Sequence, residues 1–91
     1  MTTNPTLARI QKILVTILNE TEENTRYEDI FEYFLELDKL IEHFENFLGS
    51  YYDDLCYELN NVDYFIQDVR PYILELLYRV DDLLLNYKYW V

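Results

Sequence analysis

Apolar residues recur every three or four positions along most of the chain, which is the spacing of an α-helix with one buried face. The first such stretch opens with Asn4 and Pro5, a typical N-cap followed by proline at the first helical position. The apolar positions behind them keep the helical period: Leu7, Ile10, Ile13, Leu14, Ile17 and Leu18. This pattern predicts a helix over about 5–19, followed by a polar connection over 20–24.

A second helix is predicted over about 26–48. Thr25 and Glu28 have the spacing of a capping box at its start. Gly49 supplies a left-handed residue for its end, and Ser50 begins the next cap. The apolar positions between these signals are Tyr27, Ile30, Phe34, Leu37, Ile41, Phe44 and Leu48.

From Ser50 onward the apolar spacing alternates between three and four without a slip, as in a heptad pattern. Pro71 lies in the middle of this pattern and leaves two interpretations. Either one long helix is kinked at Pro71, or a turn at 68–70 separates helices of about 51–68 and 71–88. An interior proline costs about 3 kcal/mol, which favours the turn. A continuous helix would lack an intramolecular partner at its far end and would require a dimer.

The predicted fold is therefore all-α, a small bundle of three or four helices that forms one domain over 1–91. One glycine and two prolines are too few for the tight turns of a sheet protein of 91 residues. The last segment is apolar on nearly all sides, so it belongs either in the centre of the bundle or at a subunit interface. For a homodimer, the expected interface residues are Ile73, Leu76, Val80, Leu83, Tyr87 and Trp90.

Charge narrows the class of partner. Eighteen acidic residues against seven basic ones give a formal net charge of −11. This balance excludes ordinary nucleic-acid binding, which needs Lys and Arg against phosphates, and it disfavours an anionic membrane. An acidic surface attracts a basic protein instead, although excess charge also serves solubility alone.

The residues that catalysis or metal binding would need are scarce. His43 is the only histidine and Cys56 the only cysteine, so neither a zinc site nor an internal disulfide can form. No glycine-rich loop is present to hold a phosphate. We therefore predict a protein that is not an enzyme and has no metal or cofactor. Arg9 and Lys12 interrupt the first apolar stretch, unlike a secretory leader, so the cytoplasm is the expected location.

Two surfaces are candidates for binding a partner. One is a row of carboxylates in the second helix, spaced about 4 Å apart along its axis at about 1.5 Å rise per residue, against about 3.4 Å per charge in one DNA strand. The row consists of Glu28, Asp29, Glu32, Glu36, Asp38, Glu42 and Glu45. The other is a ridge of tyrosines and acids on the outer side of the third helix: Asp53, Asp54, Tyr57, Asn61, Tyr64 and Asp68. A solvated charged face, or packing of the ridge against a fourth helix or second subunit, is the alternative for each.

A short, acidic, tyrosine-rich helical chain is similar in composition to phage and mobile-element inhibitors that occupy the nucleic-acid groove of a nuclease, restriction enzyme or CRISPR effector. The resemblance covers the whole chain and rests on no motif. It implies a DNA-mimicking inhibitor with Glu28, Asp29, Glu32 and Glu36 among the contact residues. The other hypotheses are an immunity protein or antitoxin that masks a toxin, and a structural subunit of a homo-oligomer.

Overall fold

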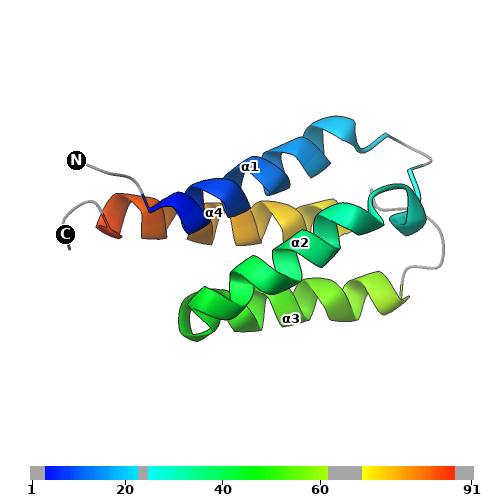
Figure 1. Ribbon diagram of the computed structural model, residues 1–91. Coiled ribbons are helices and arrows are strands. Elements are labelled where there is room, and N and C mark those ends of the chain that lie inside the picture. The colour runs from blue at the N-terminus through cyan, green and yellow to red at the C-terminus, as the bar shows by residue number, and fades with distance from the viewer. Residues whose placement is uncertain (1–3, 23–24, 62–68, 88–91) are drawn as a thin grey trace.

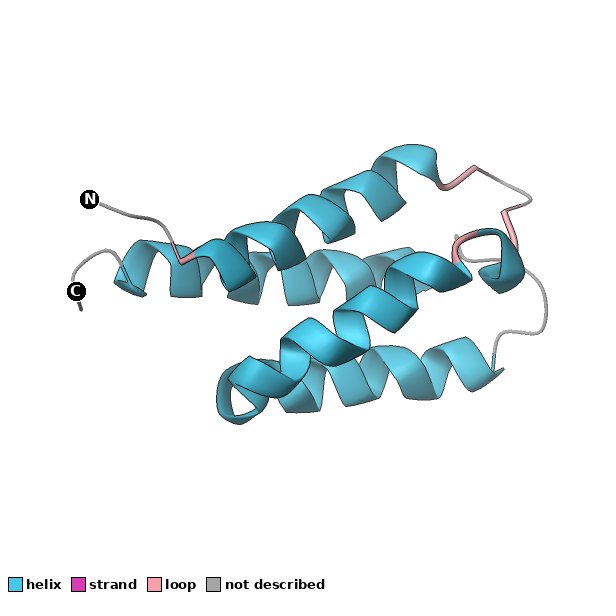
Figure 2. Ribbon diagram, in the orientation of Figure 1, coloured by secondary structure: helices cyan, strands magenta, loops and turns pink. Residues whose placement is uncertain are grey.

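The chain is a bundle of antiparallel helices. The computed structural model describes residues 4–22, 25–61 and 69–87, with the backbone alone at Tyr27, Asn61 and Tyr87. Within these ranges the elements are α1 (Pro5–Glu20), η1 (Tyr27–Asp29), α2 (Phe31–Ile41), η2 (Glu42–Phe44), α3 (Glu45–Asn61) and α4 (Arg70–Tyr87), where η marks a 3₁₀-helix. Figure 2 shows no strand in this part of the chain. The predicted all-α bundle is confirmed.

Each helix runs antiparallel to its neighbours in the bundle (Figure 1). The helices form a closed ring in which α1 packs on α2, α2 on α3, α3 on α4, and α4 again on α1. Polar contacts between side chains mark the four seams: Arg9 with Glu36, Tyr52 with Asp38, Arg79 with Tyr51, and Gln11 with Asp81. The bundle therefore has two opposite sides, the α2–α3 side and the α1–α4 side.

The apolar stripes that define the helices meet in one core. Every apolar position predicted for α1 is buried, and Asn4 caps this helix by accepting hydrogen bonds from the backbone N–H groups of Thr6 and Leu7 at 3.0 and 3.1 Å. From the other helices the core takes Ile30, Phe34, Leu37, Ile41, Phe44, Leu48, Tyr52, Leu55, Val69, Ile73, Leu76, Val80, Leu83 and Leu84. No charged side chain of the described residues is buried.

Pro71 opens a fourth helix. α4 begins at Arg70, so Pro71 lies in its first turn, where a missing N–H breaks no helical hydrogen bond. Because α4 lies antiparallel on α3, the interpretation as one kinked helix is wrong and a separate fourth helix is confirmed. The turn predicted at 68–70 is not confirmed, since residue 68 lies outside the described residues and α4 already begins at Arg70.

The expected dimer interface on the last helix is also wrong in four of its residues. Ile73, Leu76, Val80 and Leu83 are buried in the single chain, because the apolar face of α4 packs on α1 and α3. These side chains are core residues. The Tyr87 side chain and Trp90 lie outside the described residues.

The boundary predicted at Gly49 is wrong. Gly49 lies inside α3 without a positive φ, and the chain reverses earlier, at η2. Ile41, Glu42 and Glu45 all keep right-handed helical φ and ψ, so this reversal uses a short 3₁₀ segment and needs no glycine. A Cβ added at Gly49 would lie 2.9 Å from the Cγ atom of Glu45, so a larger residue here requires that side chain to shift.

The predicted capping box at Thr25 is wrong as well. The Thr25 hydroxyl accepts a hydrogen bond from the Glu22 N–H at 2.8 Å, and the Asp29 carboxylate accepts one from the Arg26 N–H at 3.0 Å. These contacts replace the predicted cap, and the 3₁₀-helix η1 precedes α2, which starts at Phe31.

Candidate protein-binding surface

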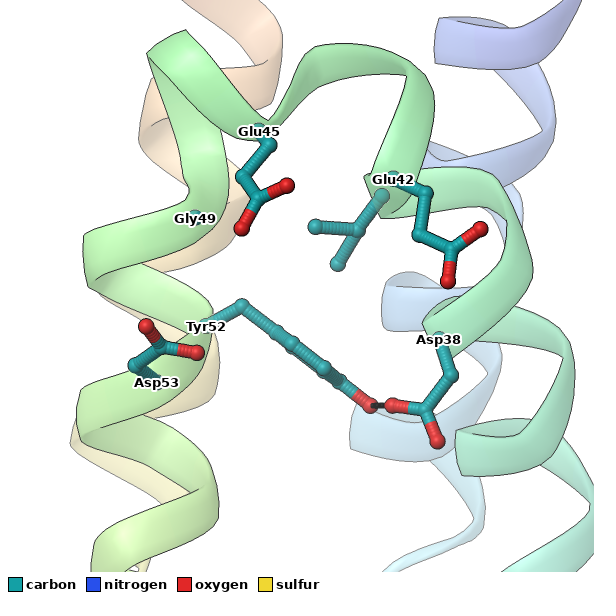
Figure 3. Close-up of a pocket in the computed structure, with 7 residues that line it drawn as sticks. Asp38, Glu42, Glu45, Gly49, Tyr52 and Asp53 are labelled. Atoms are coloured by element: carbon teal, nitrogen blue, oxygen red, sulfur yellow. Dashed lines mark hydrogen bonds between the residues drawn. The ribbon is translucent and has the colours of Figure 1, made fainter.

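A pocket of about 320 Å³ opens between α2 and α3, beside the reversal at η2. Figure 3 shows Asp38 and Glu42 on one wall and Glu45, Tyr52 and Asp53 on the other. Ile41 and Gly49 complete the lining. Four carboxylates thus gather around one cavity, and we call this set, Asp38, Glu42, Glu45 and Asp53, the acidic pocket. None of the four belongs to an ion pair among the described residues, and carboxylate oxygens suit the N–H groups of a lysine or arginine side chain.

Tyr52 fixes the floor of the acidic pocket. Its ring is buried between the two helices, and its hydroxyl donates to the Asp38 carboxylate and approaches the Phe34 carbonyl at 3.3 Å. Burial and the hydrogen bond to Asp38 raise the pKa of the Tyr52 phenol above its ordinary value. Tyr52 therefore remains a neutral donor, and the contact holds α2 and α3 at a fixed separation.

The lone cysteine lies next to this contact. Cys56 is half-buried one turn after Tyr52, and burial raises the pKa of its thiol. A raised thiol pKa lowers the thiolate fraction at neutral pH, so Cys56 has the environment of a structural residue.

The predicted carboxylate row is divided by the fold. Glu28, Asp29 and Glu32 are exposed on η1 and the first turn of α2, at the opposite end of this helix from the acidic pocket. Because α2 ends at Ile41, the evenly spaced row on one straight helix is wrong. Apart from Glu36, its members form two groups, one at each end of α2.

Glu36, in the middle of the row, is neutralised inside the chain. Arg9 on α1 donates to both of its carboxylate oxygens, from Nε at 2.5 Å and from the terminal nitrogen at 2.9 Å. This bidentate pair lowers the pKa of the Glu36 carboxyl and ties α1 to α2. Glu36 is therefore not one of the unpaired carboxylates of the predicted row.

The predicted ridge on α3 is present in the part that the structure describes. Asp53 and Asp54 are exposed, and Tyr57 is 66% exposed, so its ring is not covered by α4. Asp53 belongs both to the ridge and to the acidic pocket. The Asn61 side chain, Tyr64 and Asp68 lie outside the described residues.

Most carboxylates on the α2–α3 side have no base beside them. Among the described residues, the two ion pairs are Arg9 with Glu36 and, at 3.9 Å, Arg79 with Asp82. Neither pair includes a member of the acidic pocket or any of Glu28, Asp29, Glu32 and Asp54. This side of the bundle therefore presents unpaired negative charge to solvent.

Comparison with known proteins adds no other chemistry. No protein-family model, no curated protein and no solved structure matches the chain. Over the described ranges, no three His, Cys, Asp or Glu side chains are arranged to hold a metal ion, and His43 is exposed. None of the described helices combines the length and the apolar character that a membrane span requires.

Proposed function

We propose that this chain is a non-catalytic inhibitor that binds a basic, nucleic-acid-handling protein, such as a nuclease, in the cytoplasm. It acts by occupying the positively charged groove in which that protein holds DNA or RNA. The observation that carries the proposal is the unpaired negative charge of the α2–α3 side, within a chain of net charge −11.

The distribution of charge supports binding by this side. The acidic pocket places four carboxylates over one cavity, and Asp54 and Tyr57 continue the surface along α3. Tyr57 offers a large aromatic area with a polar tip, which is typical of protein interfaces. A groove lined by Lys and Arg for phosphates would meet carboxylates in their place.

Binding that depends on many charges should also depend strongly on the salt concentration. The field of many like charges steers a basic partner toward the acidic side, and salt screens this field over about 8 Å at physiological ionic strength. Binding should therefore weaken steeply as salt is added, and nucleic acid should compete for the same groove.

The test is capture of proteins from a cell lysate on the immobilised chain, followed by elution with double-stranded DNA. The expected eluate consists of nucleic-acid-binding proteins, whose enzymatic activity the free chain then inhibits. Replacing Glu42→Gln together with Glu45→Gln is expected to weaken capture about tenfold, because the acidic pocket loses two of its charges.

The matched control is Glu75→Gln with Asp82→Asn on α4, which removes the same number of charges from carboxylates outside the pocket. This control should keep wild-type capture. Equal losses in both variants would mean that net charge alone acts, and proteins that DNA fails to release would contradict groove occupation.

A further inference from the structure

The α1–α4 side of the bundle carries an exposed apolar strip. Val15 on α1 is 39% exposed, and Tyr78 and Leu85 on α4 are 66% and 57% exposed. Leu74, half-buried one turn before Tyr78, extends the strip along α4. We call these four residues the apolar seam.

Two hydrogen bonds between α1 and α4 indicate that the members of the apolar seam lie on the same side of the bundle. Gln11 donates to Asp81 at 2.7 Å, and Arg70 donates to the Leu18 carbonyl at 3.0 Å. Val15 lies between Gln11 and Leu18 at helical spacing, so it shares their side of α1. On α4, the same helical spacing of three or four residues places Leu74, Tyr78 and Leu85 on the side of Arg70 and Asp81.

The two flanks of the apolar seam have opposite charge. On α1, Lys12 lies three residues before Val15, and the helix has no acidic residue before Glu20. On α4, Glu75 and Asp82 lie on the flank away from α1. Apolar area and both signs of charge thus occur together on the α1–α4 side.

We propose that the apolar seam binds a second copy of this chain, related to the first by a two-fold axis parallel to α1 and α4. A two-fold interface must be complementary to itself, and a basic flank beside an acidic flank meets that condition. Around this axis, α1 of one copy faces α4 of the other. The four apolar side chains of each copy then cover those of its partner.

The register of the helices agrees with this arrangement. Rotation about an axis parallel to the helices leaves each residue at its own height along the bundle. Since Gln11 meets Asp81 within one chain, Lys12 lies at a height between Glu75 and Asp82. In the dimer, Lys12 of each copy therefore lies over the acidic flank of the other, and the contact occurs twice.

The dimer leaves the α2–α3 side free, so it goes beyond the proposed inhibition. It also responds to salt in the opposite direction. Two copies of a chain with net charge −11 repel each other, and salt screens that repulsion while apolar contact persists. Salt should strengthen the dimer and weaken capture of a basic partner, so failure of one proposal is distinguishable from failure of the other.

The experiment is sedimentation equilibrium of the full chain over a range of salt. We expect a monomer–dimer equilibrium whose dissociation constant falls at least about tenfold between about 0.02 M and about 0.5 M NaCl. Tyr78→Gln and Leu85→Gln should each raise the dissociation constant about tenfold, since each change occurs twice in the dimer. A monomer at every salt concentration would overturn the proposal.

Two further sets of variants test the assigned surface and its register. Leu35→Gln, at an exposed apolar position on α2, should leave the dimer unchanged, and loss of the dimer there would contradict the assigned surface. Lys12→Glu should weaken the dimer about tenfold, and adding Asp82→Lys, which returns the net charge to −11, should restore it. Failure of that restoration would reject the two-fold register. Circular dichroism verifies that each variant is folded.

Discussion

The two opposite sides of the bundle are built by the same helical spacing and present different chemistry. On the α1–α4 side, α4 buries a continuous apolar face against α1. The four side chains of the apolar seam remain exposed or half-buried on the outside of these two helices. On the α2–α3 side, the helices separate around the acidic pocket, and one tyrosine spans the gap. The bundle is therefore closely packed on the α1–α4 side, which we call the closed side. The α2–α3 side has a pocket lined by carboxylates, and we call it the open side.

This difference separates the residues that stabilise the fold from those that present unpaired charge to solvent. Burial of apolar area stabilises the fold wherever it occurs, whereas unpaired carboxylates contribute nothing to packing and repel one another. Keeping these charges on the side with the looser packing leaves the α1–α4 core intact. Substitutions at equivalent positions on the two sides can test that division.

The largest expected effect comes from truncating matched isoleucines. Ile73→Ala, on the closed side, removes a fully buried side chain and should lower the free energy of unfolding by about 2–5 kcal/mol. Ile41→Ala, at 4% exposure, borders the acidic pocket, so little new cavity forms beyond the space that is already open. Its cost should lie near the lower end of that range. Urea denaturation followed by circular dichroism measures both.

The contrast between the two sides of the bundle requires that Ile73→Ala lower the free energy of unfolding more than Ile41→Ala does. An equal or larger loss for Ile41→Ala would show that the α2–α3 side is packed as tightly as the α1–α4 side, and the pocket would then not be open in solution.

A smaller effect is expected from the contact that spans the open side. Tyr52→Phe removes the hydroxyl that donates to Asp38 and should cost about 1 kcal/mol at neutral pH. The raised pKa of Tyr52 adds a dependence on pH. Above about pH 10 the unfolded chain loses the phenol proton while the folded chain keeps it, so stability falls with rising pH by about 1.4 kcal/mol per unit.

Urea denaturation between about pH 8 and pH 11 measures this slope, which should become shallower in Tyr52→Phe. Tyr57→Phe is the matched control, because the exposed Tyr57 hydroxyl has no hydrogen bond among the described residues. An identical alkaline slope in the wild type and Tyr52→Phe would rule out a protonated Tyr52 as the link between α2 and α3.

Much of this fold follows from periodicity. The cap at Asn4, the buried stripe of α1 and the start of a helix near Pro71 all depend on local chemistry that a sequence displays directly. The apolar stripe of 34–55 was equally regular, and that regularity concealed the reversal at η2. Three or four residues separate the apolar positions on both sides of this turn, so the spacing carries no mark of it.

The acidic pocket was not predictable for the same reason. Asp38, Glu42, Glu45 and Asp53 come together only because the chain reverses between Ile41 and Glu45. Likewise, the pairing of Glu36 with Arg9 depends on the register between α1 and α2, which no local motif encodes. Composition predicted an acidic surface, but tertiary packing decides which carboxylates remain unpaired.

Gly49 offers the finest test of how the open side is built. A glycine inside a helix is about 1 kcal/mol less stable than alanine, so Gly49→Ala should stabilise α3 unless the new methyl group meets an obstacle. The obstacle is the Glu45 side chain, whose Cγ atom must move from 2.9 Å. We therefore expect a gain well below about 1 kcal/mol in the wild-type background and the full gain when Glu45→Ala is also present.

Urea denaturation of the four chains of this cycle measures both gains. If Gly49 instead ended a helix in the left-handed conformation, alanine would destabilise the protein by about 1 kcal/mol in either background, and the hairpin of α2 and α3 that forms the acidic pocket would be contradicted.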